Sequence, residues 1–280
     1  MLNDQWSMDS AMLQKKLFLL STLNAELDTR VAREVPFFQF PALSVYPDVA
    51  HFVFTRHGGV SDSAFRSLNV SFSTGDSAKN VETNLSMIRE ITGATSLRFM
   101  NQVHGKNIVI LRKSNFQDGG GPFTADAIIT DLPGVALLVK QADCQAVILY
   151  DPVRKVVSNV HCGWRGNTHG LLRAVIAAMR AEFGCDPSRL RAAIGPSLGP
   201  CCAEFITYQE IFPESFRPFM IRDNFFDLWA VTRAQLLESG LKEAHIESAD
   251  WCTRCRTDLF YSYRGEGKTG RFATVVMLKA

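Results

Sequence analysis

The sequence lacks a hydrophobic run long enough to cross a bilayer. Its apolar stretches, such as VALLV at 135–139 and AVILY at 146–150, are far shorter than the roughly 20 residues that a membrane-spanning helix needs. Lys15 and Lys16 precede the short apolar run LFLL, but a serine interrupts that run and no small-residue cleavage site follows. We therefore expect neither a membrane span nor a secretion signal, and we interpret residues 1–30 as an amphipathic extension with helical character.

The sequence also lacks an excess of charge of either sign. Thirty Lys and Arg residues stand against 28 Asp and Glu residues, which leaves a formal net charge of +2, with no run of five like charges. Proteins that bind nucleic acid or an acidic membrane surface present concentrated basic patches. The balance therefore argues against both kinds of partner, while an apolar content of 46% is sufficient for a globular core.

A disulfide framework is absent as well. The seven cysteines are an odd number in a long chain, which favours reduced thiols in the cytoplasm. Cys252 and Cys255 form a CxxC pair, half of a zinc ribbon, but the second CxxC pair that would complete a tetrahedral site is missing. The adjacent Cys201 and Cys202 are not expected to face one metal together. We therefore predict packing roles for both pairs.

The sequence does contain a series of short runs rich in β-branched and aromatic residues, which predict strands. They lie at residues 51–56, 107–112, 125–130, 135–142, 145–151, 155–162 and 272–278. The turn residues at 132–134 (Leu-Pro-Gly) and 151–152 (Asp-Pro) suit tight, hairpin-like connections. Neighbouring strands are therefore expected to be antiparallel.

Apolar residues recur with a helical period at 80–92 and 168–183, and a third helix is expected near 229–240. Helices are interspersed among the strands, and the chain has no internal repeat and no linker-like stretch. This order indicates a single α/β domain with mixed, largely antiparallel sheets and flanking helices. We assign the domain to residues 41–280 and treat residues 1–40 as an N-terminal extension.

Three potential metal ligands stand at predicted strand ends or in the turns beside them. His104 lies in NQVHG, Cys144 in QADCQAV and His161 in VHCGWRG. Imidazole and thiolate suit Zn²⁺, and three protein ligands leave a fourth position for water or substrate, as in catalytic zinc sites. Two other interpretations fit the same residues. Cys144 could be a nucleophile with His161 as its base and no metal, or all three could be ordinary buried, hydrogen-bonded residues.

A further candidate region is FTRHGGVS, residues 54–61, in which Arg56 and His57 follow a predicted strand. A planar guanidinium can hold phosphate or carboxylate through two parallel hydrogen bonds. The glycines that follow allow a ligand to approach the backbone closely. The simpler interpretation is a surface arginine beside a turn.

Several motifs occur together and in order along the chain. They are FTRHGGVSDSAFRSLNVSFSTGD, NQVHG, ADAIIT, ADC, VHCGWRG, IGPSLGPCCAEF and YSYRGEGKTGR. As a set they resemble the YfiH-type laccase-domain family, also described as polyphenol-oxidase-like or LACC-type purine nucleoside phosphorylases. The resemblance covers residues from about 45 to 280. It implies one α/β domain in which Zn²⁺ is bound by His104, Cys144 and His161.

The resemblance also implies an enzyme that splits adenosine, inosine or methylthioadenosine into base and sugar phosphate, with adenosine deamination as a further activity. Arg56, as part of the catalytic set, and Arg165 are then expected to hold the phosphate. The other expected substrate contacts are His57, Asn101, Gln102 and Asp143. The expected partners are a purine nucleoside and phosphate, without nucleic acid or membrane. The oligomeric state is left open, with a monomer as one option.

The copper chemistry that the laccase name suggests does not fit this sequence. A multicopper oxidase needs on the order of ten histidines, many in HxH pairs, together with a blue-copper site. This chain has six histidines and no HxH pair. Three alternatives to the phosphorylase remain: an amide hydrolase that edits UDP-MurNAc-amino acid precursors of peptidoglycan, a Cys-His hydrolase without metal, and a zinc-stabilised binding module.

Overall fold

The computed structural model describes residues 19–23, 35–117 and 122–280. Within these residues most strands belong to two large sheets. The first sheet has the order β1 (Leu19–Leu23), β2 (Val35–Gln39), β3 (Val49–Phe54), β15 (Phe272–Leu278), β8 (Val135–Gln141), β4 (Ser96–Asn101) and β6 (Phe123–Thr124). The second has the order β14 (Ile246–Ser248), β11 (Arg191–Ile194), β9 (Gln145–Asp151), β10 (Val156–Cys162), β7 (Ala127–Thr130) and β5 (Ile108–Leu111).

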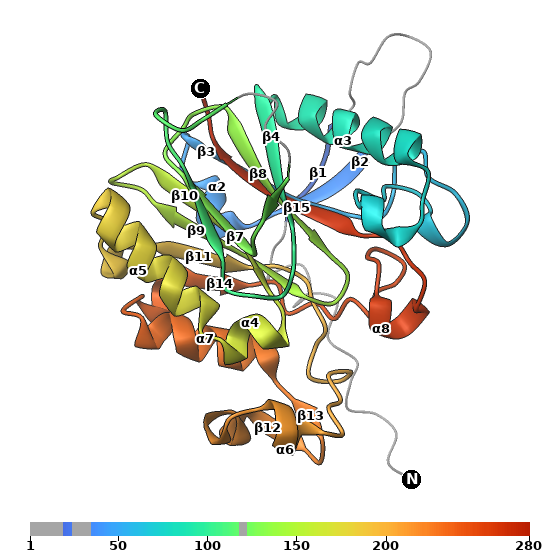
Figure 1. Ribbon diagram of the computed structural model, residues 1–280, viewed down its shortest axis with the longest axis vertical. Helices are drawn as coiled ribbons and strands as arrows, with labels where there is room; N and C mark the ends of the chain where they lie inside the picture. Colours follow the sequence, from blue (N-terminus) through green and yellow to red (C-terminus); the bar gives the residue numbers. More distant parts are fainter. Residues whose placement is uncertain (1–18, 24–34, 118–121) are drawn as a thin grey trace.

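The two sheets pack face to face, and each has helices on its outer side (Figure 1). Successive side chains of a strand point to opposite faces, so a strand buried on both sides serves two cores. In β9, Ile148 and Tyr150 lie in the cluster between the sheets, whereas Val147 and Leu149 pack on the helical side. This explains why these strands read as continuous apolar runs and not as alternating ones.

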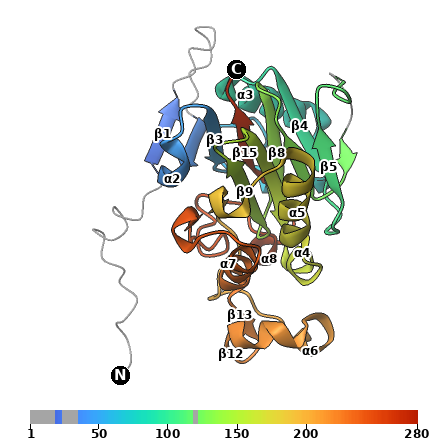
Figure 2. The same cartoon turned by 90° about the vertical axis from the view of Figure 1, so that its left-hand side faces the viewer.

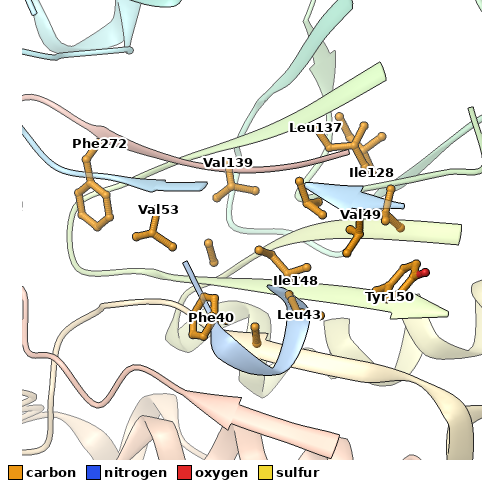
Figure 3. Close-up of a cluster of buried hydrophobic side chains, with 14 of the residues drawn as sticks. Phe40, Leu43, Val49, Val53, Ile128, Leu137, Val139, Ile148, Tyr150 and Phe272 are labelled. Carbon is orange, nitrogen blue, oxygen red and sulfur yellow. The ribbon is translucent and has the colours of Figure 1, made fainter. Parts of the chain in front are cut away.

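Figure 3 shows the cluster between the sheets, to which both layers contribute. Val53 and Val139 come from the first sheet, and Ile128 and Ile148 come from the second. All four side chains are fully buried. The sheets are therefore held together by a shared hydrophobic core, which fixes how their ends meet.

The helices cover the outer faces. α3 (Ala78–Thr92) packs on the first sheet, and α5 (Leu171–Phe183), with α7 (Leu228–Glu238) beside it, packs on the second (Figure 1). The helix predicted at 168–183 is α5, which begins at Leu171, because Gly170 takes a positive φ of 69° and separates it from the preceding α4 (Trp164–Thr168).

The shorter elements complete the description. They are α2 (Pro41–Ser44), α6 (Tyr208–Ile211), α8 (Tyr263–Glu266), β12 (Met220–Arg222), β13 (Phe225–Phe226) and the 3-10 turns Ser63–Phe65, Phe72–Thr74, Pro187–Arg189, Glu214–Phe219 and Glu243–His245. The segment that contains α6, β12 and β13 projects from the end of the molecule in both views (Figures 1 and 2) and has an apolar cluster of its own.

The strand pairing confirms largely antiparallel, mixed sheets, but only one of the two expected hairpins forms. β9 and β10 are antiparallel neighbours joined by the turn after Asp151. The turn at 132–134 joins β7 to β8, which lie in different sheets, so that prediction is wrong. Turn chemistry fixes a change of direction, whereas the layer that the next strand enters depends on long-range packing.

The sheet begins before the boundary assigned from the sequence. β2 lies within residues 1–40, pairs with β3, and buries Val35 and Phe37. The helical character expected for residues 1–30 falls outside the described residues except at Leu19–Leu23, which form strand β1. No helix in the described part of the chain is both long and apolar enough to cross a membrane.

Candidate metal centre and active site

The fold brings the three predicted metal ligands together. His104 follows β4 of the first sheet, and His161 lies near the end of β10 in the second. Cys144 stands in the connection from β8 to β9, where the chain passes from one sheet to the other. One ligand atom of each residue lies within 4.8 Å of the others, and Cys144 Sγ is 3.8 Å from His104 Nε2.

The backbone around these residues is specialised for close approach. His104 and Asp143 adopt positive φ angles of 58° and 85°, which are uncommon for residues with a Cβ and tend to occur at functional sites. Gly163 leaves space for the thiol, because a Cβ at this position would lie 2.7 Å from Cys144 Sγ and 3.5 Å from His104 Cδ2. A larger residue there would displace the sulfur.

Asp126, a residue that the sequence analysis did not select, orients both histidines. Its Oδ1 accepts a hydrogen bond from His161 Nδ1 at 2.8 Å and another from the backbone amide of His104 at 2.9 Å. Its Oδ2 accepts one from the amide of Gly105 at 2.7 Å. The carboxylate is fully buried. The sequence did carry a signal for Asp126, because it is an acidic residue at the start of the apolar run ADAIIT. A carboxylate that is buried there requires hydrogen-bond or charged partners.

The electrostatics favour an ion pair between the Cys144 thiolate and the His161 imidazolium. Burial disfavours ionisation of Cys144, but the neighbouring His161 and His104 outweigh it and lower the pKa of the thiol. Burial likewise opposes the charge on His161, yet Cys144 and Asp126 raise its pKa. The pKa of Asp126 is lowered despite its burial, through its bonds to His161 and to the two backbone amides. The site therefore holds its sulfur as a thiolate readily.

The donor set fits a metal ion. Because His161 Nδ1 is bonded to Asp126, its Nε2 is the nitrogen left for a metal, an arrangement common among histidine ligands. Two imidazoles and one thiolate match the ligands of Zn²⁺. Among the described residues no fourth histidine, cysteine or carboxylate joins this group. The arrangement thus corresponds to an open, three-ligand site.

The three residues lie on the wall of a cavity of about 1050 Å³. Of the other predicted contacts, Asn101, Gln102, Asp143 and Arg165 line it. The Gln102 side chain is tied to β8 by two hydrogen bonds with the backbone of Lys140. The Asp143 carboxylate accepts bonds from Thr253 Oγ1, Ser262 Oγ and the amide of Arg264, which tie this part of the cavity wall to the C-terminal segment.

Arg56 and His57 are not among the residues that line this cavity. The Arg56 guanidinium donates to Glu266 at 2.9 Å and to the carbonyl of Thr257 at 2.8 Å, and it lies over the Tyr261 ring. The His57 ring bonds to a backbone carbonyl of the same C-terminal segment. Arg56 therefore lies away from the cavity lining and supports the segment that leads to α8, and its part in holding phosphate stays a prediction.

The cavity lining includes basic side chains that the sequence analysis did not select. Lys140, Arg264 and Arg271 line the cavity together with Arg165. Burial, reinforced by the charge of Arg271, lowers the pKa of Lys140 to about 8. Among the described residues of the lining, Asp143 is the acidic one, and its oxygens are occupied as described above. The cavity is therefore electropositive and suited to an anion.

Two packed sheets with this cluster at one end define an α/β fold that is also found in solved structures. YlmD from Geobacillus stearothermophilus superposes with a TM-score of 0.79 at 28% identity, covering 87% of this chain and 96% of that one. YfiH from Bacillus licheniformis gives a TM-score of 0.77 at 27% identity, with the same coverage. These neighbours confirm the expected fold class.

The sequence comparisons then give the family. Residues 50–279 match the family model described as multi-copper polyphenol oxidoreductase laccase, and the chain belongs to this family. A Bacteroides thetaiotaomicron protein named purine nucleoside phosphorylase is 31% identical over 85% of this chain and 95% of its own. A Streptomyces coelicolor protein of the same name is 34% identical over 82% of this chain and 96% of its own.

Proposed function

We propose that this protein is a zinc-dependent purine nucleoside phosphorylase. The observation that carries the proposal is the convergence of His104, Cys144 and His161 on the wall of a cavity that also presents four basic side chains. The names of the two relatives described above support the same activity. The copper of the family's description is not part of the proposal, because six histidines without an HxH pair do not supply a multicopper centre.

The charges of the cavity favour phosphate as one substrate. Arg165, Arg264 and Arg271 can offer paired N–H groups to phosphate oxygens. Aromatic side chains of the lining, among them the exposed Phe72 and Tyr263, can pack against a purine. A phosphate oxygen and a nucleoside can thus be held in one compartment, which converts a bimolecular reaction into an oriented one.

In phosphorolysis a phosphate oxygen bonds to the anomeric carbon of the sugar while the bond from that carbon to the purine nitrogen breaks. The bonding electrons leave with the base, so negative charge develops there and the surrounding cations stabilise it. Lys140, with a pKa of about 8, can hold or release a proton near neutral pH and lies in the same cavity. When bound, Zn²⁺ would supply Lewis-acid chemistry by polarising a ligand atom in its open position.

The proposal is tested with the purified protein, adenosine or inosine, and phosphate. We expect free base and ribose 1-phosphate in equal amounts, no base release without phosphate, and loss of turnover in Cys144→Ala. Cys185→Ala, a buried cysteine remote from the cavity, serves as the matched control and should retain turnover. Equal turnover by Cys144→Ala would reject the assignment.

The same assay separates the alternatives. Formation of inosine and ammonia from adenosine without phosphate would show the deaminase activity. Release of free serine from UDP-MurNAc-Ser, without phosphorolysis, would establish the amide hydrolase instead. Turnover that persists after metal removal but depends on Cys144 would favour the metal-free Cys-His hydrolase, and binding without any turnover would favour the binding module.

A further inference from the structure

A second group of metal-ligand atoms lies outside the cavity. The sulfur atoms of Cys201, Cys202, Cys252 and Cys255 are all within 4.8 Å of one another, and none of these residues lines the cavity. Cys255 Sγ is 3.6 Å from the sulfurs of both Cys201 and Cys202. The prediction that the adjacent cysteines would not face one site was therefore wrong, and they supply the pair that the CxxC motif lacked.

The sheet topology explains how the two pairs meet. β11 and β14 are parallel neighbours, so the loops that follow them leave the sheet side by side. The pairing continues beyond the strands, because the Ser197 amide donates to the Trp251 carbonyl at 3.1 Å and the Thr253 amide donates to the Ser197 carbonyl at 3.0 Å. Each loop then turns and presents its two cysteines to the other loop.

The distances fit a tetrahedral metal site. With zinc–sulfur bonds of about 2.3 Å, neighbouring sulfurs of a tetrahedron lie about 3.8 Å apart. A disulfide would require about 2.05 Å and would use only two of the sulfurs. The observed spacing of 3.6 Å, shared by two pairs, is close to the tetrahedral value.

The surroundings also suit thiolate ligands. The backbone amides of Gly199 and Cys255 lie close to the Cys252 sulfur. Gly199 allows this approach, because a Cβ there would lie 2.9 Å from the Cβ of Cys252. The Arg222 side chain donates to the Cys201 carbonyl at 3.3 Å and places a positive charge beside the cluster, which favours a negatively charged tetrathiolate centre.

We propose that Cys201, Cys202, Cys252 and Cys255 bind a structural Zn²⁺ in a closed tetrahedral site, separate from the centre in the cavity. Four sulfur ligands leave no position for a substrate, so the ion acts on the structure and not on a reaction. The ion connects two parts of the chain that line the cavity. One is the loop that contains Ser197 and Leu198, and the other is the segment that leads to Arg264. The cluster thereby steadies one side of the basic cavity.

The test uses the full chain with Cys144→Ala, so that the cavity centre does not contribute. After reduction and loading with Zn²⁺, this variant should retain one Zn²⁺ per chain, and replacement by Co²⁺ should give the intense absorption bands of tetrahedral cobalt with four thiolates. Adding Cys255→Ser should remove both the bound ion and the bands. Adding Cys185→Ala in its place should leave both unchanged.

Several results would overturn the proposal. One is Cys144→Ala protein that retains no metal, and another is a disulfide among these cysteines in protein prepared under reducing conditions, detected by intact mass. Bound iron in place of zinc would contradict the choice of ion. If the Cys255→Ser variant does not fold, the cobalt spectrum of Cys144→Ala alone still decides. Failure of the phosphorylase assay would not alter any of these measurements.

Discussion

Among the residues of the cavity centre, Asp126 combines several tasks in one buried carboxylate. It fixes the ring of His161 and the backbone of His104 at once. Outer partners of this kind orient the ligand and set its basicity, and their loss typically weakens metal binding about 10–100-fold. A change that keeps the size of Asp126 but removes its charge therefore separates orientation from packing.

We predict that Asp126→Asn weakens Zn²⁺ binding at the cavity centre by about 10–100-fold. Competition with a chromogenic chelator measures the change. Asp151→Asn is the matched control, because Asp151 is equally buried and accepts backbone amides in the β9–β10 turn, away from the cavity. Unchanged affinity in Asp126→Asn would show that the carboxylate only packs.

Gly163 offers a second test of the cavity centre. Its Cβ would enter the space of the Cys144 sulfur, so we predict that Gly163→Ala loses most of the Zn²⁺ bound at this centre, as measured by metal analysis. Gly105→Ala should retain it, because a Cβ there meets its nearest neighbours at an ordinary 3.6 Å. Full occupancy in Gly163→Ala would contradict the close approach seen here.

Some residues of the site could be recognised from the sequence, and others could not. The ligand types His104, Cys144 and His161 were recognisable because they end predicted strands and fit known motifs, and the structure places them together. The position of Arg56 outside the cavity lining could not be predicted, because its partners lie some 200 positions later in the chain. Of the arginines in the cavity lining, Arg165 was selected through its motif, whereas Arg264 and Arg271 lie in the motif YSYRGEGKTGR without being singled out.

At the scale of elements, the strands on both sides of each core were predictable, but their partners were not. A run such as that of β8 shows burial on two faces, whereas its pairing with β15 and with β4 joins distant parts of the sequence. The four-cysteine cluster was missed for the same reason, because it depends on the parallel pairing of β11 with β14.

His51 on β3 makes the stability of this element depend on pH. Its Nε2 accepts the Phe40 amide at 2.6 Å, which requires an unprotonated nitrogen. Burial, together with the charge of Lys279, lowers its pKa from 6.5 to about 4. The unfolded state therefore binds a proton that the folded state does not. The contribution of His51 is complete above pH 6.5 and is lost as the pH falls toward 4.

We predict that the free energy of unfolding falls by up to about 3 kcal/mol more in the wild-type protein than in His51→Gln between pH 7 and pH 4. Glutamine can accept the same amide without titrating, so the difference between the two proteins isolates this histidine. Urea unfolding across the pH range measures it. Parallel curves for the two proteins would show that His51 does not titrate as described.

At the scale of the whole molecule, the shared core between the sheets argues for one cooperative unit. Leu137 of β8 is fully buried in that core (Figure 3). We predict that Leu137→Ala lowers the free energy of unfolding by about 2–5 kcal/mol while circular dichroism and tryptophan fluorescence still report one transition. The exposed Val153→Ala should change it by less than about 0.5 kcal/mol. Separate transitions would instead indicate two domains.

The short connection from β8 to β9 links metal binding to the stability of the fold. His104 follows a strand of the first sheet, His161 lies in a strand of the second, and Cys144 stands in the connection between them. An ion bound by all three would therefore cross-link the two sheets. Part of the free energy of metal binding would then add to the free energy of unfolding and raise the melting temperature. A change that shifts one sheet against the other would separate the three ligands, so loss of the metal would be an early sign of destabilisation elsewhere in the fold.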